Sequence, residues 1–260
     1  MYDDIKVNYV GENCYSLEIG EYLLVFDYCN GILNIPDNKK TIFFATSNRA
    51  GHYTQEILKL FDMDNFSYVL SSDIAYDKGE GNVIYLNNEG LSVEKLKDLY
   101  KKKNVIFINP SEKYKLNKDI EVLSFSSKGS GLSFLVRILG FSIFYTGESI
   151  FFDKAKENTE LVNYLYKIFD REGEIDLGFF PIRTDKGEGN FTYPRSFIEI
   201  FDPQIFFPLN VDEDFKMSKD FAVSFSDNPT DVRFIDEDNQ EFEIDMDDWR
   251  KDSREVVKEV

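Results

Sequence analysis

Short, unbroken apolar runs set the tightest limit on how this chain can fold. Residues 22–26 (Tyr-Leu-Leu-Val-Phe) form one such run, and residues 42–45 (Ile-Phe-Phe-Ala) form another after a polar interval. A half-exposed strand alternates apolar and polar residues, so an unbroken run indicates a strand that is covered on both faces. The sequence therefore predicts sheets that lie inside the protein rather than on its surface.

Strands and helices are predicted in two successive clusters with a similar plan. Thr54 and Ser92 are candidate caps for two helices, the first of which carries Ile57. Two more helices are predicted at residues 161–169 and 194–201, and strands at 6–27 (as a pair), 42–45, 68–70, 83–86, 105–108, 120–125, 132–139, 142–144, 177–180 and 205–207. Strand clusters separated by helices are typical of two packed sheets with helices outside.

The chain can fill one large core. Its 260 residues are 42% hydrophobic and include 25 Phe and 15 Tyr, which is enough for a single sizeable domain. Beyond residue 210 the composition becomes acidic, with strand-like pieces at 221–225, 232–235 and 242–244 and a candidate amphipathic helix at 249–260. A segment so charged buries too little apolar surface to fold alone. We predict a main domain over residues 1–210, with residues 211–260 as an acidic C-terminal extension packed on it.

The formal net charge of −18 restricts the partners that this chain can take. A field of that sign repels phosphate backbones and anionic lipid headgroups, so nucleic acids and membranes are not expected partners. An unidentified small molecule or protein remains the expected partner. The N-terminus lacks a basic region followed by an apolar one, and no apolar run is long enough to span a membrane. We therefore expect a soluble cytoplasmic protein.

The two cysteines, Cys14 and Cys29, are predicted to be free thiols. A hairpin that turns near Gly20 places Cys14 opposite Asp27 rather than opposite Cys29, and free thiols agree with a reducing compartment. With one histidine and two separated cysteines, the chain cannot assemble a zinc site of the His/Cys type.

The only histidine, His52, lies in a polar loop that follows the apolar run 42–45. Together with other segments, this loop resembles part of the metallo-β-lactamase superfamily. The segments are residues 10–18, 24–28, 43–53, 71–74, 127–134, 143–148, 179–181 and 207–210. Their order and spacing carry the resemblance, which spans residues 5–212 and implies an αββα sandwich.

The resemblance also locates the metal ligands of that superfamily, and most of them are replaced here. Its His-x-His-x-Asp-His motif falls on Ser47, Arg49, Gly51 and His52, so one ligand of four remains. At three further positions the resemblance implies a metal-bridging Asp, a His and an Asp, where this chain has Glu148, Asn210 and Gly129, respectively. Zinc takes three or four nitrogen, thiolate or carboxylate donors, and this set offers at most two good ones.

Arg49 excludes a dinuclear centre more firmly than the missing ligands do. Its guanidinium stays protonated and has no lone pair for a cation. A divalent metal beside it would face a fixed positive charge, at a cost of several kcal/mol if poorly solvated. We predict that Arg49 pairs with Glu148 and supplies the positive charge that carboxylates such as Glu148 and Asp27 need.

The remaining candidates lie at strand ends or in a nearby loop. Asp73 is either a catalytic carboxylate or a structural acid. Residues 185–190 are glycine-rich but do not follow a strand and open a helix, so they predict a mobile loop over a pocket rather than a phosphate-binding loop. The full set of pocket candidates is Asp27, Ser47, Arg49, His52, Asp73, Glu148, Arg183, Tyr193 and Asn210.

The leading functional hypothesis is a binding or regulatory homologue without a metal site, so no cofactor is expected. One alternative is a hydrolase of a small ester, lactone or amide that holds zinc or another divalent metal through His52, Glu148 and other oxygen ligands. The other alternative is a metal-independent enzyme that uses Glu148 or His52 as acid or base beside Arg49, since an imidazole titrates near neutral pH.

Overall fold

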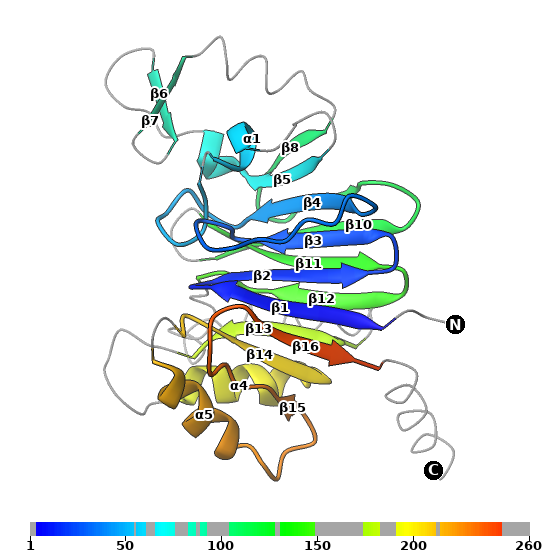
Figure 1. Cartoon of the computed structure of the whole chain (residues 1–260), viewed down its shortest axis with the longest axis vertical. Coiled ribbons are helices and arrows are strands. Elements are labelled where there is room, and N and C mark those ends of the chain that lie inside the picture. The colour runs from blue at the N-terminus through cyan, green and yellow to red at the C-terminus, as the bar shows by residue number, and fades with distance from the viewer. Residues whose placement is uncertain are drawn as a thin grey trace.

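The computed structural model of the chain is built around two large β-sheets packed face to face (Figure 1). It describes residues 4–54, 56–60, 66–75, 83–86, 89–92, 104–127, 131–148, 174–182, 191–211 and 214–245. Each of the two sheets has seven strands within these residues, and β6 (Val83–Leu86) and β7 (Glu89–Ser92) form a separate hairpin. No helix of the described part of the chain is long and apolar enough to cross a membrane.

The first sheet begins as an antiparallel meander and continues as a parallel array. Its order is β16 (Gln240–Ile244), β1 (Ile5–Gly11), β2 (Cys14–Ile19), β3 (Tyr22–Phe26), β4 (Lys40–Ala45), β5 (Ser67–Ser71) and β8 (Val105–Ile108). From β3 onward the neighbours are parallel. Tyr15 pairs with Phe26, so Cys14 faces Asp27 as expected, and both cysteines are free thiols.

The second sheet repeats this plan, as the two similar clusters in the sequence predict. Its order is β15 (Asp231–Val232), β14 (Ile205–Leu209), β13 (Leu177–Pro181), β12 (Phe141–Tyr145), β11 (Leu132–Ile138), β10 (Ile120–Ser126) and β9 (Lys113–Lys115). Strands β9 to β12 are antiparallel neighbours, and β12 to β15 are parallel ones. Strand β9 is exposed and was not predicted, because Lys-Tyr-Lys carries no apolar signal.

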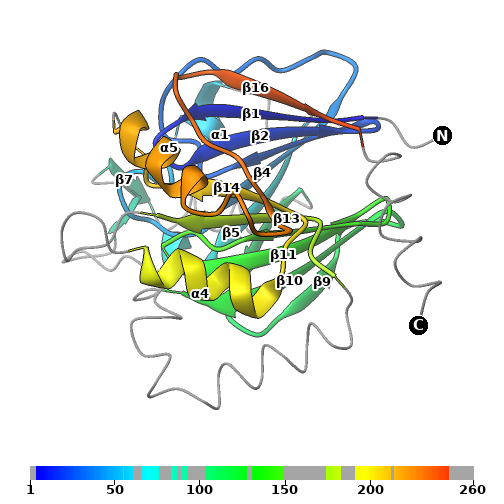
Figure 2. The same cartoon turned by 90° about the horizontal axis from the view of Figure 1, so that it is seen from below.

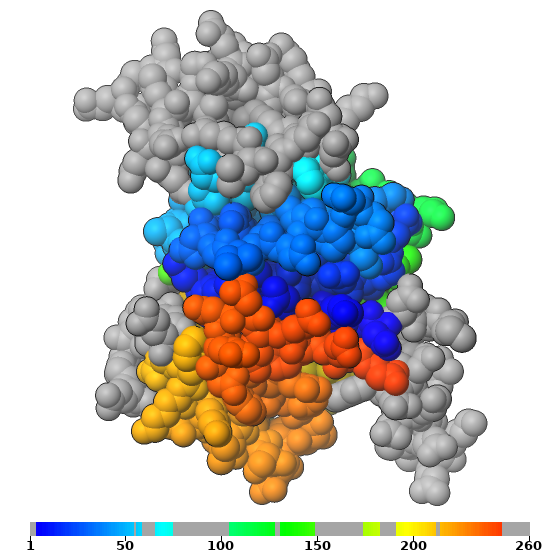
Figure 3. All heavy atoms as spheres, viewed as in Figure 1, coloured from blue at the N-terminus to red at the C-terminus, as the bar shows by residue number. Residues whose placement is uncertain are grey.

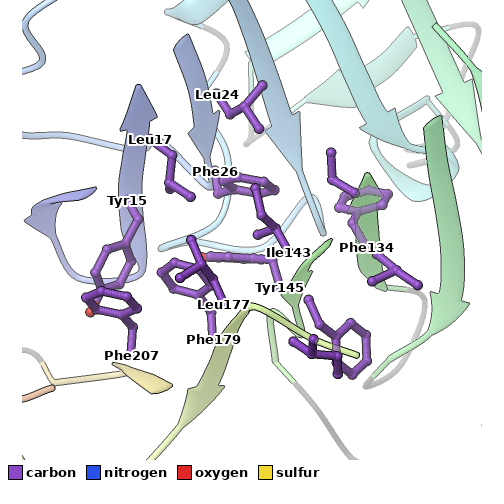
Figure 4. Packing of buried hydrophobic residues seen from close by; sticks show 14 of the residues in the cluster. Tyr15, Leu17, Leu24, Phe26, Phe134, Ile143, Tyr145, Leu177, Phe179 and Phe207 are labelled. Atoms are coloured by element: carbon purple, nitrogen blue, oxygen red, sulfur yellow. The ribbon is translucent and has the colours of Figure 1, made fainter. Parts of the chain in front are cut away.

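The main core lies between the two sheets and is rich in aromatic rings (Figure 4). Phe26 of β3 stacks on Phe44 and on Tyr145 of β12, with ring centroids 4.7 Å apart in both cases. Tyr15 of β2 contacts Phe179 of β13, edge to face. Full burial of each such side chain stabilises the fold by roughly 1.5–3 kcal/mol.

Helices cover the outer faces of the sheets. The short helix α1 (Ile57–Leu60) lies against the first sheet, where Ile57 joins the outer core with Phe43 and Tyr68. Helix α4 (Thr192–Phe201) covers the second sheet (Figure 2), with Phe197 stacked on Phe180 at 4.8 Å. The predicted αββα sandwich is therefore confirmed.

The segment after residue 211 contributes to both sheets. Strand β15 pairs with β14, and β16 pairs with β1, so each sheet gains an edge strand from it. In Figure 3 the orange and red residues of this segment lie against the blue N-terminal strand. Residues 242–244 form a strand as predicted, whereas of residues 232–235 only Val232 lies in one.

The strand predicted at residues 221–225 is wrong. Most of it belongs to helix α5 (Phe215–Val223), whose N-cap Asp214 accepts a hydrogen bond from the amide of Met217. The rings of Phe221 and Phe225, four positions apart in the chain, pack with their centroids 4.9 Å from each other. Ser92, expected to cap a helix, ends β7 instead. The helices predicted after Ser92, at 161–169 and at 249–260 lie outside the described residues.

Candidate functional site

Several polar residues follow directly on parallel strands of the first sheet. Asp27 follows β3, residues 46–53 follow β4, and Asp73 lies in the short 3-10 helix η1 (Ser72–Ala75) after β5. Because the carboxyl ends of parallel strands meet at one edge of a sheet, the fold brings these segments together. The residues after β12 and β14 of the second sheet join the same site through the contacts below.

Asp27 is the most deeply buried charged residue of the site. It is fully buried, with a backbone φ of 49°. Oδ1 accepts a hydrogen bond from the amide of Thr46 at 2.7 Å, and Oδ2 accepts one from the Thr46 hydroxyl at 2.7 Å. Nδ1 of His52 lies 2.7 Å from Oδ2. A carboxylate only accepts, so Nδ1 carries a proton and Nε2 is the ring nitrogen left for other partners.

Opposing effects act on the pKa of His52. Burial lowers this pKa, while the charge and hydrogen bond of Asp27 raise it. The charge of Glu148 also raises it, and that of Arg49 lowers it. The net result is a pKa above the usual 6.5. Glu148 and Arg49 therefore both lie close enough to His52 to influence its protonation.

Arg49 and Glu148 form the ion pair that the sequence predicts. The pair joins the loop after β4 to the segment after β12, and the two side chains are 39% and 33% exposed. The hydroxyl of Ser127 donates to the main-chain carbonyl of Glu148 at 2.7 Å, which fixes the backbone beneath the carboxylate. The guanidinium thus occupies one of the positions where the resemblance implies a metal ligand.

Asp73 holds the loop that carries Arg49. Its Oδ2 accepts hydrogen bonds from the Ser47 hydroxyl at 3.2 Å and from the amide of Asn48 at 3.3 Å. Its main-chain carbonyl accepts from the Asn48 side chain at 3.3 Å. These contacts join Asp73 to Ser47 and Asn48 of the loop.

Asn210 contributes its backbone to the site through Asn13, which was not among the predicted site residues. The amide of Asn210 donates to Oδ1 of Asn13 at 3.1 Å. Nδ2 of Asn13 donates to the carbonyl of Gly51 at 3.2 Å. The only sequence signal was that Asn13 lies in the first hairpin of the resemblance, between β1 and β2.

Gly51 occupies a position that does not suit a side chain. Its φ is 83°, and a Cβ there would lie 3.1 Å from Oε2 of Glu12 and 3.4 Å from Nδ2 of Asn13. An Asp ligand at this position would be strained in the loop as it stands.

The remaining candidates are Tyr193 and residues that the structure does not describe. Tyr193 is half-buried on α4 and packs against the core. Arg183, residues 185–190 and Gly129 lie outside the described residues.

In the part of the chain that the structure describes, the side chains at the implied ligand positions do not make up a dinuclear metal centre. Among the described residues, no group of three or more His, Cys, Asp or Glu side chains could hold a metal ion. Ser47 bonds to Asp73, and Glu148 pairs with Arg49. Of the ligand positions in the loop, only His52 keeps a free donor atom of the kind that zinc prefers.

The fold has clear counterparts among solved structures. Igni18, a metallo hydrolase from Ignicoccus hospitalis, is 14% identical, with a TM-score of 0.60 over 94% of this chain and 99% of its own. The metallo-β-lactamase-fold protein YhfI from Bacillus subtilis is 12% identical, with a TM-score of 0.58 over 93% and 100%. CmlA, a diiron β-hydroxylase from Streptomyces venezuelae, is 13% identical, with a TM-score of 0.59 over 93% of this chain and 54% of its own.

These likenesses define the fold of the chain. The chain is an αββα sandwich of two mixed sheets, and it has the metallo-β-lactamase fold that its sequence resembles. No family model and no curated protein matches the sequence. At these identities the likeness establishes the fold, and function has to be argued from the site.

Proposed function

We propose that this protein is a metallo-β-lactamase-fold homologue that has exchanged its dinuclear metal site for the Arg49–Glu148 ion pair. In this proposal it acts as a binding or regulatory protein. Without a complete ligand set, the route through a metal-activated water is closed to it. Its partner is a small molecule or a protein that contacts the site around His52.

The observation that carries the proposal is the ion pair itself. Arg49 places a fixed positive charge where a metal ligand is implied, and it engages the carboxylate of Glu148 at the position implied for the metal bridge. A cation entering the site would have to displace the guanidinium and leave it beside a like charge. Gly51 supports the same conclusion, because its backbone disfavours restoring an Asp ligand without moving Glu12.

A metal-dependent hydrolase is the second candidate, and one observation favours it. Asp27 holds Nδ1 of His52, which leaves Nε2 as the ring nitrogen for another partner. Metal-bound histidines are oriented by carboxylates in this way. Zinc or another divalent metal would then be held by His52, Glu148 and further oxygen ligands, and the substrate would be a small ester, lactone or amide.

The pairing of His52 with Asp27 supports a third candidate, a metal-independent acid–base enzyme. A histidine whose Nδ1–H is held by a buried carboxylate can exchange a proton at Nε2. Arg49 would lie beside the reacting group and bind its developing negative charge.

Metal analysis of the purified full chain separates the first two candidates. We expect the wild-type protein to carry less than one equivalent of zinc, manganese or iron after exposure to each metal. One tightly held equivalent, lost together with hydrolysis of model esters in His52→Ala, would overturn the proposal. The third candidate is tested by the same esters in the presence of a chelator. Hydrolysis that persists there and is abolished in His52→Ala would favour that candidate and overturn the binding role.

A further inference from the structure

A single side chain crosses the site and joins segments from both sheets. Asn13, in the turn between β1 and β2, is 6% exposed. Its Nδ2 donates to the Gly51 carbonyl at 3.2 Å, and its Oδ1 accepts from the Asn210 amide at 3.1 Å. The Asn13 main-chain carbonyl accepts a hydrogen bond from the Tyr145 hydroxyl at 2.5 Å. One residue therefore contacts the loop after β4, the end of β12 and the end of β14.

The two backbone groups bound by the Asn13 side chain belong to residues with positive φ. Gly51 has a φ of 83° and Asn210 a φ of 55°. Glycine adopts a positive φ without strain, but a residue with a side chain, such as Asn210, persists there only where its surroundings hold it. Neither the Gly51 carbonyl nor the Asn210 amide is part of a strand ladder. The side-chain amide of Asn13 therefore supplies the hydrogen-bond partner that a neighbouring strand would otherwise provide.

The neighbouring residue fastens a fourth segment to the same turn. Oε1 of Glu12 accepts from the side chain of Asn30 at 2.7 Å, and Oε2 accepts from the thiol of Cys29 at 3.3 Å. Both partners follow Asp27 closely in the chain. These four segments around His52 are thus all hydrogen-bonded to the turn between β1 and β2.

In a metal centre, the ion joins ligands that come from separate loops. Here the loops meet without a complete ligand set, and hydrogen bonds join them. We propose that Asn13 is the positioning residue of this site. By linking Gly51 to Asn210, it holds the loop that carries Arg49 and His52 against the end of β14. What the site binds rests on the proposed function, but the bridge does not.

The single histidine makes this proposal measurable, because only His52 contributes imidazole signals. We would record the imidazole ¹⁵N spectrum of wild type, Asn13→Ala and a control, Asn117→Ala. Asn117 is a matched control because its side chain also accepts backbone amides in a turn, from Asp119 at 2.8 Å and Ile120 at 3.0 Å. We expect displaced or doubled imidazole signals in Asn13→Ala and the wild-type spectrum in Asn117→Ala. Unchanged signals in Asn13→Ala would overturn the proposal.

A second measurement needs no variant and covers the case in which Asn13→Ala fails to fold. Hydrogen exchange of the Asn210 amide in the wild-type protein reports the bridge directly. We expect strong protection, although this residue lies beyond the end of β14, and exchange at the rate of a free loop would overturn the bridge. Metal uptake by the wild type would overturn the proposed function while leaving a protected Asn210 amide and the bridge intact.

Discussion

Thr46 and Gly147 approach each other so closely that no side chain fits between them. A Cβ on Gly147 would lie 2.7 Å from the Thr46 hydroxyl and 2.9 Å from its Cβ, and the φ of Gly147 is 58°. Thr46 is also the residue that binds both carboxylate oxygens of Asp27. The contact therefore connects the segment of Glu148 to the buried acid that orients His52.

We expect Gly147→Ala to destabilise the fold by about 1–3 kcal/mol, through crowding and an unfavourable φ. The measurement is urea denaturation. A left-handed φ alone should cost Ala about 1 kcal/mol, and crowding against Thr46 should add to this loss. A loss of no more than about 1 kcal/mol would show that contact with Thr46 contributes nothing.

Removing the charge of Arg49 should open the site to metal. We expect Arg49→Ala to bind Zn²⁺ at least about tenfold more tightly than wild type, a change of ~1.4 kcal/mol. Arg49→Lys keeps the charge and should bind like wild type. Titration calorimetry measures both. Equal Zn²⁺ affinity in the alanine and lysine variants would contradict an electrostatic role for the guanidinium.

Arg49→Ala should lower the free energy of unfolding only a little. Both partners are a third or more exposed, so solvent screens the pair, and its loss should cost about 0.2–1 kcal/mol.

The pH dependence of stability should carry the signature of His52. Its pKa is raised in the fold, so the folded state binds a proton more tightly than the unfolded state does. The resulting stabilisation is complete below the unfolded pKa of about 6.5 and is lost as pH rises through the folded value. His52→Asn keeps a donor beside Asp27 without titrating. We expect the stability difference between wild type and His52→Asn, measured by denaturation, to shrink from about pH 6 to about pH 9. A difference that grows over this range would contradict the raised pKa.

The helix that replaces a predicted strand can be tested at its cap. Asp214→Ala removes the acceptor for the amide of Met217 and should cost about 1 kcal/mol. Asp220→Ala, at an exposed position of the same helix, should cost much less. Thermal denaturation of both variants compares them, and equal losses would argue against a capping contribution.

The sequence predicts the inner strands because their residues are apolar on both faces. Strand β3 is buried along its whole length, and so is β13. The prediction failed at Phe221, where Phe-Ala-Val-Ser-Phe has the composition of a strand. Its apolar residues are also spaced as a helix requires, and the cap at Asp214 favours the helix.

The contacts of the site also differ in whether the sequence predicts them. The pairing of Arg49 with Glu148 could be predicted, because the resemblance placed both residues at one centre. The bridge at Asn13 could not, since its partners are 38 and 197 positions away in the chain. A polar residue in a turn gives no sign of which backbone groups it binds.

The pairing of β1 with β16 bears on how the protein is made. Ile5 faces Ile244 in this ladder, so β1 cannot pair with β16 until β16 has also left the ribosome. Until then, β1 has an unpaired edge, and such edges recruit strands of other chains. Contacts so distant in sequence also form slowly. A nascent chain that stops before residue 240 should therefore depend on chaperones far more than the finished one.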